Sequence, residues 1–231
     1  MVRRHTAGAG ALSGAVTLIS GAHGNAADSL RPRGGVVVIA GPDGSGKSTL
    51  AFALPSAAFG AAPVLHVHHR FRVLPQRLNS TVDITRPHDQ RPYPAWLSWA
   101  KSIYLFVDYQ LGWQVRVRKF VKSGGWVILE RGWWDIAIDQ RRYRIRSSGW
   151  LLRAMGRLLP RPDLVIILTA PVQTLRSRKT ELSSREFERQ LQGWSTVLPR
   201  NVSRAFVDVT QSPADVVAAA VDNLRRVRRS S

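Results

Sequence analysis

The sequence contains no cysteine, few lysines and no long apolar run. Without cysteine, disulfide bonds and cysteine-based zinc sites are excluded, and thiol chemistry says nothing about the compartment. No apolar run reaches the roughly 20 residues that a membrane-spanning helix needs, so we expect no membrane partner. Hydrophobic residues still make up 44% of the 231 residues. That content excludes a disordered chain and suffices for the core of one α/β domain.

Acidic residues are also scarce, and the chain carries a formal net charge of +19. Such a balance attracts anions, including nucleotides, nucleic acids and acidic membranes. Charge runs are most often solvated faces, which is the plain interpretation of most of the arginines. Two clusters, at residues 141–144 and 225–229, are dense enough to contact RNA or DNA. No signature of a nucleic-acid-binding module accompanies them, so nucleic acid is not an expected partner.

Apolar runs and amphipathic patterns alternate along the chain. Runs rich in β-branched residues predict buried strands at residues 36–40, 64–67, 126–129, 164–168 and 205–209. Apolar spacings of three and four predict helices at residues 50–58, 96–121, 151–159, 172–179, 184–197 and 212–226. Strands that alternate with helices form a parallel sheet covered on both faces. The sequence therefore predicts an α/β fold, a three-layer α/β/α sandwich with a five-stranded parallel sheet.

A glycine-rich segment follows the first predicted strand and fits the pattern G-x-x-x-x-G-K-[ST]. Its residues are Gly41, Pro42, Asp43, Gly44, Ser45, Gly46, Lys47 and Ser48, with Thr49 next in the chain. The glycines let the backbone curl so that successive N–H groups point at phosphate oxygens, and the following helix adds its positive dipole end. In this pattern the lysine reaches the β- and γ-phosphates and the serine supplies an oxygen to Mg²⁺. Because the segment lies between a strand and a helix, a P-loop NTPase site for ATP and Mg²⁺ is favoured over an ordinary glycine-rich turn.

An acid and an arginine, Glu130 and Arg131, follow the third predicted strand. Ligands of open parallel sheets lie beyond the carboxyl ends of the strands, so both are candidate catalytic residues. Glu130 is interpreted as a Mg²⁺ ligand, through water, or as a base for the acceptor, and Arg131 as a group that binds the acceptor or the transferring phosphoryl group. The alternative is a salt bridge at the end of the strand. Trp133 and Trp134 are interpreted either as a stacking surface for an acceptor ring or as core aromatics.

Cations concentrate after the fourth predicted strand, at Arg176, Arg178 and Lys179. Phosphoryl transfer spreads negative charge over the γ-phosphate oxygens, and arginines that close over them stabilise that charge. Arg176 and Arg178 are therefore candidate catalytic residues of a lid. On a helix they point in different directions, so not every cation here faces inward. A solvated helix face is the alternative.

These segments resemble the thymidylate kinase family of nucleoside monophosphate kinases over roughly residues 34–228. The resemblance rests on the P-loop with its internal Asp-Gly, on Glu130-Arg131 in place of the family's Asp-Arg pair, and on segments 163–178 and 207–213. It implies an ATP-dependent kinase in which Glu130 and Arg131 hold Mg²⁺ and the phosphates. It also suggests a homodimer with a contact through the predicted helix 96–121. Glu130 in place of Asp is also similar to the Glu-Arg pair of deoxynucleoside kinases, which includes their catalytic base.

The chain departs from the family on the acceptor side. The family's Arg-Glu-Pro-Gly motif is replaced by residues 66–71, where Arg70 is the candidate for a retained function. The family's Asp-Arg-x-Gln falls near Asp108, and its base-reading arginine is missing. The segment 135–144, with Gln140 and Arg142, resembles a divergent group of thymidylate kinase-like proteins. The candidate acceptor-binding residues are therefore Arg70, Asp108 and Gln140, together with Trp133.

Three histidines, His66, His68 and His69, lie on and after the second predicted strand. Strand alternation puts His66 and His68 on one face. Because a clear third ligand is missing, a polar lining of the acceptor site is favoured over a metal site.

The patterns and the resemblance together predict a kinase that moves the ATP γ-phosphate to a nucleoside monophosphate such as dTMP. The rival acceptors are a sugar or cell-envelope metabolite and a deoxynucleoside, and the non-enzyme alternative is an ATP-binding regulatory protein. Use of ATP suggests the cytoplasm. We place the kinase domain at residues 34–228. Glycine and polar residues interrupt the weakly apolar stretch 11–20, so residues 1–33 are expected to be a flexible tail, or the remnant of a longer upstream region, rather than a signal peptide.

Overall fold

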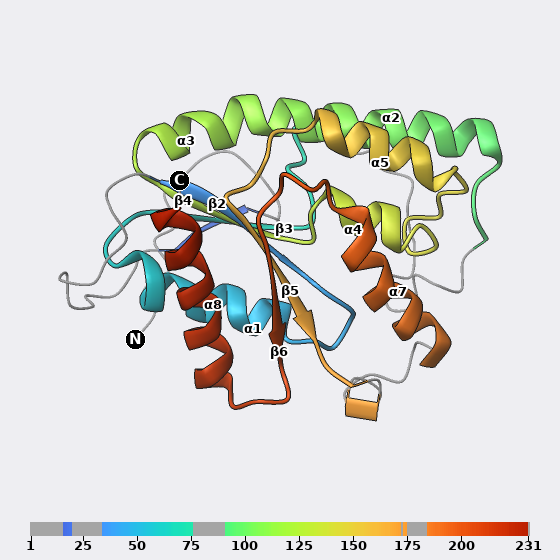
Figure 1. The fold of residues 1–231 in the computed structure, drawn as a ribbon. Coiled ribbons are helices and arrows are strands. Elements are labelled where there is room, and N and C mark those ends of the chain that lie inside the picture. Colours follow the sequence, from blue (N-terminus) through green and yellow to red (C-terminus); the bar gives the residue numbers. More distant parts are fainter. Residues whose placement is uncertain (1–15, 20–33, 76–90, 172, 175–183, 231) are drawn as a thin grey trace.

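The computed structural model describes residues 16–19, 34–75, 91–171, 173–174 and 184–230 (Figure 1). Its centre is a sheet with the strand order β1-β3-β4-β2-β5-β6. The strands are β1 (Val16–Ile19), β2 (Gly35–Ala40), β3 (Val64–His68), β4 (Trp126–Glu130), β5 (Leu164–Thr169) and β6 (Arg204–Asp208). The five strands β3, β4, β2, β5 and β6 are parallel to one another, which confirms the predicted five-stranded parallel sheet.

Helices cover both faces of this sheet (Figure 1). They are α1 (Lys47–Leu54), α2 (Ala95–Gly112), α3 (Arg118–Lys122), α4 (Trp133–Ile138), α5 (Gly149–Leu158), α7 (Ser184–Val197) and α8 (Pro213–Arg229). A π-helical turn, Pro55–Phe59, continues α1, and a second, Trp113–Val117, joins α2 to α3 into one long helix. Pro55 has no amide hydrogen, so the regular bonding of α1 cannot continue through it. Among the described residues, no helix is both long and apolar enough to cross a membrane.

Alternate side chains of each strand point to opposite faces, and this divides the core in two. In β2, Val37 and Ile39 pack with residues of α1 and α8. Val36 and Val38 pack with residues of α2, α4, α5 and α7 on the other face. All four of these side chains are buried. Each contributes about 1.5–3 kcal/mol of transfer free energy, so the two layers of helices are both needed to hold the strands.

The first strand lies outside the predicted set. Residues 16–19 pair antiparallel with β3, with Val16 opposite Val67 and Ile19 opposite Val64. These four residues fall in the segment 1–33 that was expected to be a tail, so that expectation does not hold for them. The rest of that segment lies outside the described residues.

The long helix α2 contacts the core with one side only. Gly112 allows the close approach of Phe71, because a Cβ at this position would lie 2.2 Å from Phe71 Cγ. The opposite side exposes an apolar stripe at intervals of three and four residues, made of Trp96, Trp99, Ile103, Val107, Leu111 and Val115. The chain therefore presents an unusual amount of apolar surface along this helix.

The basic cluster at the C-terminus has a structural partner. Arg228 on α8 donates to the Gly34 carbonyl at 2.8 Å, lies 3.6 Å from Asp163 and stacks on the Trp126 ring. Asp163 also accepts the Val36 amide hydrogen at 2.7 Å. This arginine thus fastens α8 to the start of β2, which accounts for one member of the 225–229 cluster without a nucleic acid.

Candidate active site

The P-loop occupies the turn between β2 and α1, at the carboxyl edge of the sheet. Three of its glycines, Gly41, Gly44 and Gly46, have φ angles of 137°, 82° and 85°, a backbone region that only glycine adopts at low cost. Ser45 is buried, and its hydroxyl oxygen has no hydrogen-bond partner. Buried polar atoms nearly always have a hydrogen-bond partner, which can be a water or a ligand. The geometry therefore fits a phosphate group held in the loop.

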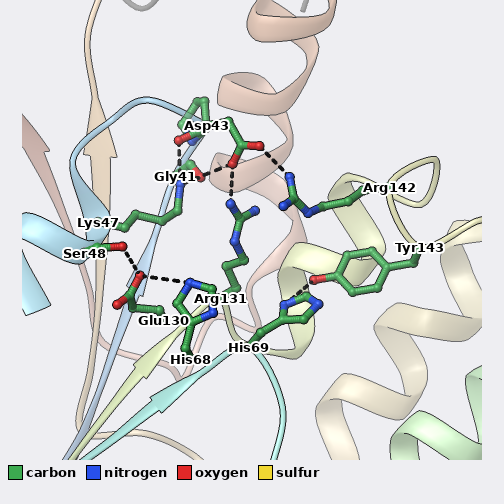
Figure 2. Close-up of polar contacts among 11 residues, drawn as sticks. Gly41, Asp43, Lys47, Ser48, His68, His69, Glu130, Arg131, Arg142 and Tyr143 are labelled. Carbon is green, nitrogen blue, oxygen red and sulfur yellow. Dashed lines mark hydrogen bonds and ion pairs between the residues drawn. The ribbon is translucent and has the colours of Figure 1, made fainter. Parts of the chain in front are cut away.

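Lys47 lies at the start of α1 with its ammonium group turned back onto the loop (Figure 2). Its Nζ donates to the carbonyl oxygens of Gly41 at 2.9 Å and Pro42 at 2.6 Å, and it lies 3.7 Å from Asp43 Oδ1. Burial lowers the pKa of Lys47, and the nearby Arg131 charge adds to this, while Asp43 opposes it. The lysine is thus a buried cation held by two carbonyl groups and by the Asp43 carboxylate.

Glu130 ends β4 directly beside the P-loop (Figure 2). Its Oε2 accepts a hydrogen bond from Ser48 Oγ at 2.7 Å, and its Oε1 lies 2.7 Å from His66 Nε2. Burial alone would raise the pKa of Glu130, but the hydrogen bonds from His66 and Ser48 outweigh it and lower the pKa. The carboxylate therefore stays ionised at neutral pH, with one oxygen fixed by His66 and the other facing Ser48.

Arg131 turns the chain sharply after β4. Its φ of 64° is left-handed, which costs a residue with a side chain about 1–3 kcal/mol. The turn is held by the Arg131 amide, which donates to the Ile39 carbonyl at 3.0 Å, and by the Tyr109 hydroxyl, 3.2 Å from the Arg131 carbonyl. The same hydroxyl lies 3.1 Å from the carbonyl of His69, which is also left-handed with a φ of 85°. Tyr109 of α2 therefore stabilises both turns at the edge of the site.

The turn directs the Arg131 side chain at Asp43 of the P-loop. Asp43 is buried, and its two carboxylate oxygens accept hydrogen bonds from Arg131 and from Arg142 (Figure 2). Burial would raise the pKa of Asp43, but the charges of Arg131, Lys47 and Arg142 outweigh it and hold the pKa well below its usual range. One carboxylate thus joins three cations that come from the P-loop, the end of β4 and the segment after α4.

A small polar cavity lies beyond this cluster, lined by both signs of charge. Asp43, Arg131, Asp135, Asp139 and Arg142 line it. Asp135 is 5% exposed, and its Oδ2 has no hydrogen-bond partner. Burial raises the pKa of Asp135, with repulsion from Asp139 and Asp43 adding to the effect, although the charges of Arg131 and Lys47 oppose it. This acid thus lines the same cavity as Asp43 of the P-loop.

The loop after β3 forms a wall beside Tyr143, a residue that lines the cavity. His69 stacks on Tyr143, and its Nδ1 lies 3.2 Å from the tyrosine hydroxyl. Burial lowers the pKa of His69 to about 3, and the charges of Arg131 and Arg142 add to the effect. His69 is therefore neutral throughout the physiological range.

Two of the predicted acceptor-binding residues lie together on this wall. Asp108 is fully buried and accepts the amide hydrogens of Arg72, Val73 and Leu74 at 3.2, 2.8 and 2.9 Å. Arg70 Nε lies 3.6 Å from Asp108 Oδ2, and the Nε and Nη2 of Arg70 are buried without a hydrogen-bond partner. Asp108 thus positions the loop, and Arg70 offers unsatisfied donors.

Two other predicted acceptor-binding residues have structural partners instead. Trp133 is 1% exposed, donates its indole hydrogen to the Leu152 carbonyl at 2.8 Å and packs against Phe106 and Tyr109. It is a core residue, so its interpretation as a stacking surface for an acceptor ring is wrong. Gln140 Oε1 accepts the Ser147 amide hydrogen at 3.3 Å, and this bond stabilises the loop before α5. The predicted lid residues Arg176 and Arg178 lie outside the described residues.

The sequence did not identify the roles of Arg142, Asp135 and Tyr143. Arg142 and Tyr143 belong to a basic cluster that was first considered as a nucleic-acid contact. The structure instead aims Arg142 at Asp43 and packs Arg144 on the Tyr93 ring, 4.1 Å from its centre. The only available signal was the resemblance of residues 135–144 to divergent kinase-like proteins, because no local pattern predicts which member of a charge run turns inward.

The oxygens next to the P-loop suit Mg²⁺. Ser48 supplies a hydroxyl and Glu130 an ionised carboxylate, and Mg²⁺ in nucleotide sites takes one or two protein oxygens together with substrate phosphates and waters. The described residues contain no group of three or more His, Cys, Asp or Glu side chains arranged to hold a metal alone. The donor set thus fits an ion that arrives with a nucleotide.

The fold is similar to that of known kinases. It matches the thymidylate kinase from Candida albicans with a TM-score of 0.59 and 18% sequence identity, over 85% of this chain and 94% of that one. It matches the thymidylate kinase from Ehrlichia chaffeensis with a TM-score of 0.55 and 15% identity, over 85% of this chain and 98% of that one. Comparison of the sequence with protein-family models and with curated proteins finds no match.

The comparisons establish the fold. The chain is thymidylate kinase-like in fold and divergent in sequence, as the resemblance predicted. Identities below one fifth establish the fold and leave the acceptor open.

The raised pKa of Asp135 predicts a pH-dependent stability. The folded chain keeps a proton on Asp135 that the unfolded chain releases in the ordinary carboxyl range, so the contribution of this group is present at low pH and is lost as the pH rises through the raised pKa. Asp135→Asn mimics the protonated form. We expect its melting temperature to exceed that of the wild type by about 3 °C or more at roughly pH 8, and to differ little at roughly pH 4.

Melting curves across this pH range, with the exposed Asp222→Asn as a matched control, provide the measurement. A difference of the same size at every pH would show that Asp135 is ionised in the folded chain even at low pH.

Proposed function

We propose that the protein is an ATP-dependent phosphotransferase of thymidylate kinase type, which moves the ATP γ-phosphate to a nucleoside monophosphate. The observation that carries the proposal is the Ser48–Glu130 hydrogen bond of 2.7 Å, which joins the P-loop helix to the acid after β4. It brings the oxygens suited to Mg²⁺ next to the lysine suited to the β- and γ-phosphates. A glycine-rich turn that binds no phosphate does not require a hydrogen bond between the following helix and a buried carboxylate.

Each residue of the site has a part in the proposed transfer. The P-loop amides and Lys47 bind the phosphates of ATP, and Ser48 and Glu130 hold Mg²⁺, which neutralises charge on the phosphates when it is bound. Arg131 and Arg142 lie beside the P-loop on Asp43, where they are placed to stabilise charge on the transferring group. Arg176 and Arg178 are proposed to complete the lid.

We assign Glu130 to the metal rather than to general base catalysis. Its pKa is lowered, whereas a general base works best with a pKa near the operating pH. Both of its oxygens already face Ser48 and the histidines, with His68 Nε2 at 3.6 Å from Oε2. An ionised, oriented carboxylate is suited to a hard cation.

The acceptor is proposed to bind on the wall formed by the loop after β3. Arg70 Nε forms an ion pair with Asp108, and Nη2 is a buried donor without a hydrogen-bond partner, which suits the phosphate of a nucleoside monophosphate. The polar cavity at Asp135 adjoins the P-loop and can take a hydroxyl of the same acceptor. The arginine that reads the base in the thymidylate kinase family is missing at the matching position. The proposed acceptors therefore include dTMP and other phosphorylated molecules. Consumption of ATP suggests the cytoplasm as the place of action.

The test is release of ADP from Mg·ATP by the purified protein, alone and with dTMP, and then with a panel of nucleotides, nucleosides and sugars. We expect an acceptor from this panel to stimulate release. Lys47→Ala is expected to lower the stimulated rate at least about 100-fold, because a fixed charge is lost at the phosphates. The exposed Lys119→Ala is the matched control and should retain the wild-type rate.

Two results would contradict the proposal. Unchanged turnover in Lys47→Ala would remove the P-loop from the chemistry. Binding of ATP without release of ADP in the presence of any acceptor would indicate the regulatory, non-enzymatic alternative.

We also propose that the chain forms a homodimer through the apolar stripe of α2. Trp96 is 73% exposed and Ile103 51% exposed, and a surface of this kind gains stability when a second copy covers it. The stripe runs along one long helix, so two copies can pair over their full length about a two-fold axis.

The mass in solution tests the dimer. Sedimentation of the wild type is expected to give twice the 25.7 kDa mass of the chain, and Trp99→Glu with Ile103→Glu to give the monomer. Trp150→Glu with Phe206→Glu changes two exposed apolar residues elsewhere and should remain dimeric. A monomeric wild type at concentrations of roughly 100 μM would rule out a stable pairing on this face.

A further inference from the structure

A second cavity lies at the opposite edge of the sheet from the P-loop. It has a volume of about 600 Å³ and opens between the C-terminal ends of α5 and α7, beside the segments that precede β5 and β6. The two cavities share no lining residue, although Trp134 of this cavity is the chain neighbour of Asp135 in the first. Its volume falls within the range of pockets that hold small-molecule ligands.

Four arginines line this cavity: Arg153, Arg157, Arg161 and Arg200. No aspartate or glutamate is among the described residues that line it. None of the four forms an ion pair or hydrogen bond with any part of the chain that the structure describes. Like charges gathered around one hollow repel each other, and an anion bound between them removes that repulsion.

The ends of the two helices do not account for the arginines. Cations near helix C-termini commonly serve the last carbonyl groups. Here Arg204 donates to the carbonyls of Leu198 and Pro199 after α7, at 3.4 and 2.6 Å. The Leu158 carbonyl of α5 accepts from Gln110 at 3.1 Å. Other side chains therefore satisfy these carbonyls, and the four arginines stay available for a ligand.

The inner wall supplies a buried donor as well. Trp134 lines the cavity and is 4% exposed, and its indole Nε1 has no hydrogen-bond partner. Gly156 of α5 also lines the cavity, and a Cβ there would lie 3.1 Å from this nitrogen. The absence of a side chain at Gly156 thus lets α5 pack closely against the Trp134 indole, which lines the cavity. Because a buried N–H group without an acceptor is costly, a ligand oxygen would relieve the cost.

We propose that this cavity binds a phosphorylated small molecule, held by the four arginines and the Trp134 indole. Guanidinium groups match phosphate oxygens in a two-pronged geometry, and several of them around one hollow favour a ligand with two or more negative charges. A hollow of this volume suits a small molecule. The site does not depend on the proposed kinase activity.

Inorganic pyrophosphate is the probe, and calorimetric titration of the full chain is the measurement. Because the P-loop also binds phosphates, we expect two sites in the wild type. Lys47→Ala with Ser48→Ala is expected to leave the cavity site alone. Adding Arg157→Ala and Arg161→Ala to that variant should weaken the remaining binding about tenfold or more, since two charged hydrogen-bond donors are lost. Adding Arg226→Ala and Arg229→Ala instead removes the same charge from the exposed face of α8 and should leave binding unchanged.

The indole resonances give a second readout that does not require a variant of the cavity to fold. In a ¹⁵N spectrum of the Lys47→Ala/Ser48→Ala chain, the Trp134 N–H signal should move as pyrophosphate is added. Trp134→Phe identifies this signal by its disappearance.

Three results would overturn the proposal. The first is the absence of binding once the P-loop is altered, and the second is a Trp134 signal that does not move. The third is that the chain binds a single-stranded oligonucleotide but no pyrophosphate, and that both pairs of arginine substitutions weaken this binding equally. That result would indicate a diffuse basic surface that binds nucleic acid. The two proposals fail separately, because an absence of ADP release in the kinase test would not change the pyrophosphate binding expected in this cavity.

Discussion

The pairing of β2 with β4 is the interaction on which the rest of the site depends. The two strands run parallel with Ile39 opposite Glu130, and the Arg131 amide continues the ladder to the Ile39 carbonyl. This register places the P-loop, which leaves β2, beside the acid and the arginine that leave β4. A slip of one residue would turn Glu130 to the other face of the sheet and away from Ser48. Both faces of these strands are buried, so the hydrophobic core itself fixes the register.

Charge balance is the second constraint on the site. Lys47, Arg131 and Arg142 meet at the Asp43 carboxylate, which holds together three cations that would otherwise repel one another. Phosphates bring more negative charge than one carboxylate and compete with Asp43 for the same cations. In the proposed function, these three cations therefore already lie where a phosphate of the ligand would bind.

The sequence predicted those features that depend on local pattern. The β-branched run 36–40 and the glycine spacing that follows it were sufficient for β2 and the P-loop, and strand-end placement was sufficient for Glu130 and Arg131. The six-residue helix α4 was missed because it is too short to show a period. Trp133 was ambiguous because a tryptophan next to a site and a tryptophan in the core look alike in sequence. Sequence could not predict which way the side chains of His69, Arg70 and Arg142 point. Their positions depend on contacts between segments more than 30 residues apart. No local pattern records such contacts.

Calorimetric binding of ATP with and without Mg²⁺ tests the central claim most directly. That claim is that Ser48 and Glu130 together hold the ion that accompanies a nucleotide in the P-loop. The account predicts one ATP per chain, with an affinity that Mg²⁺ strengthens in the wild type and no longer strengthens in Glu130→Gln, a change that keeps the shape of the side chain and removes its charge. ATP binding that ignores Mg²⁺ in the wild type, or a Mg²⁺ effect that survives in Glu130→Gln, would contradict it.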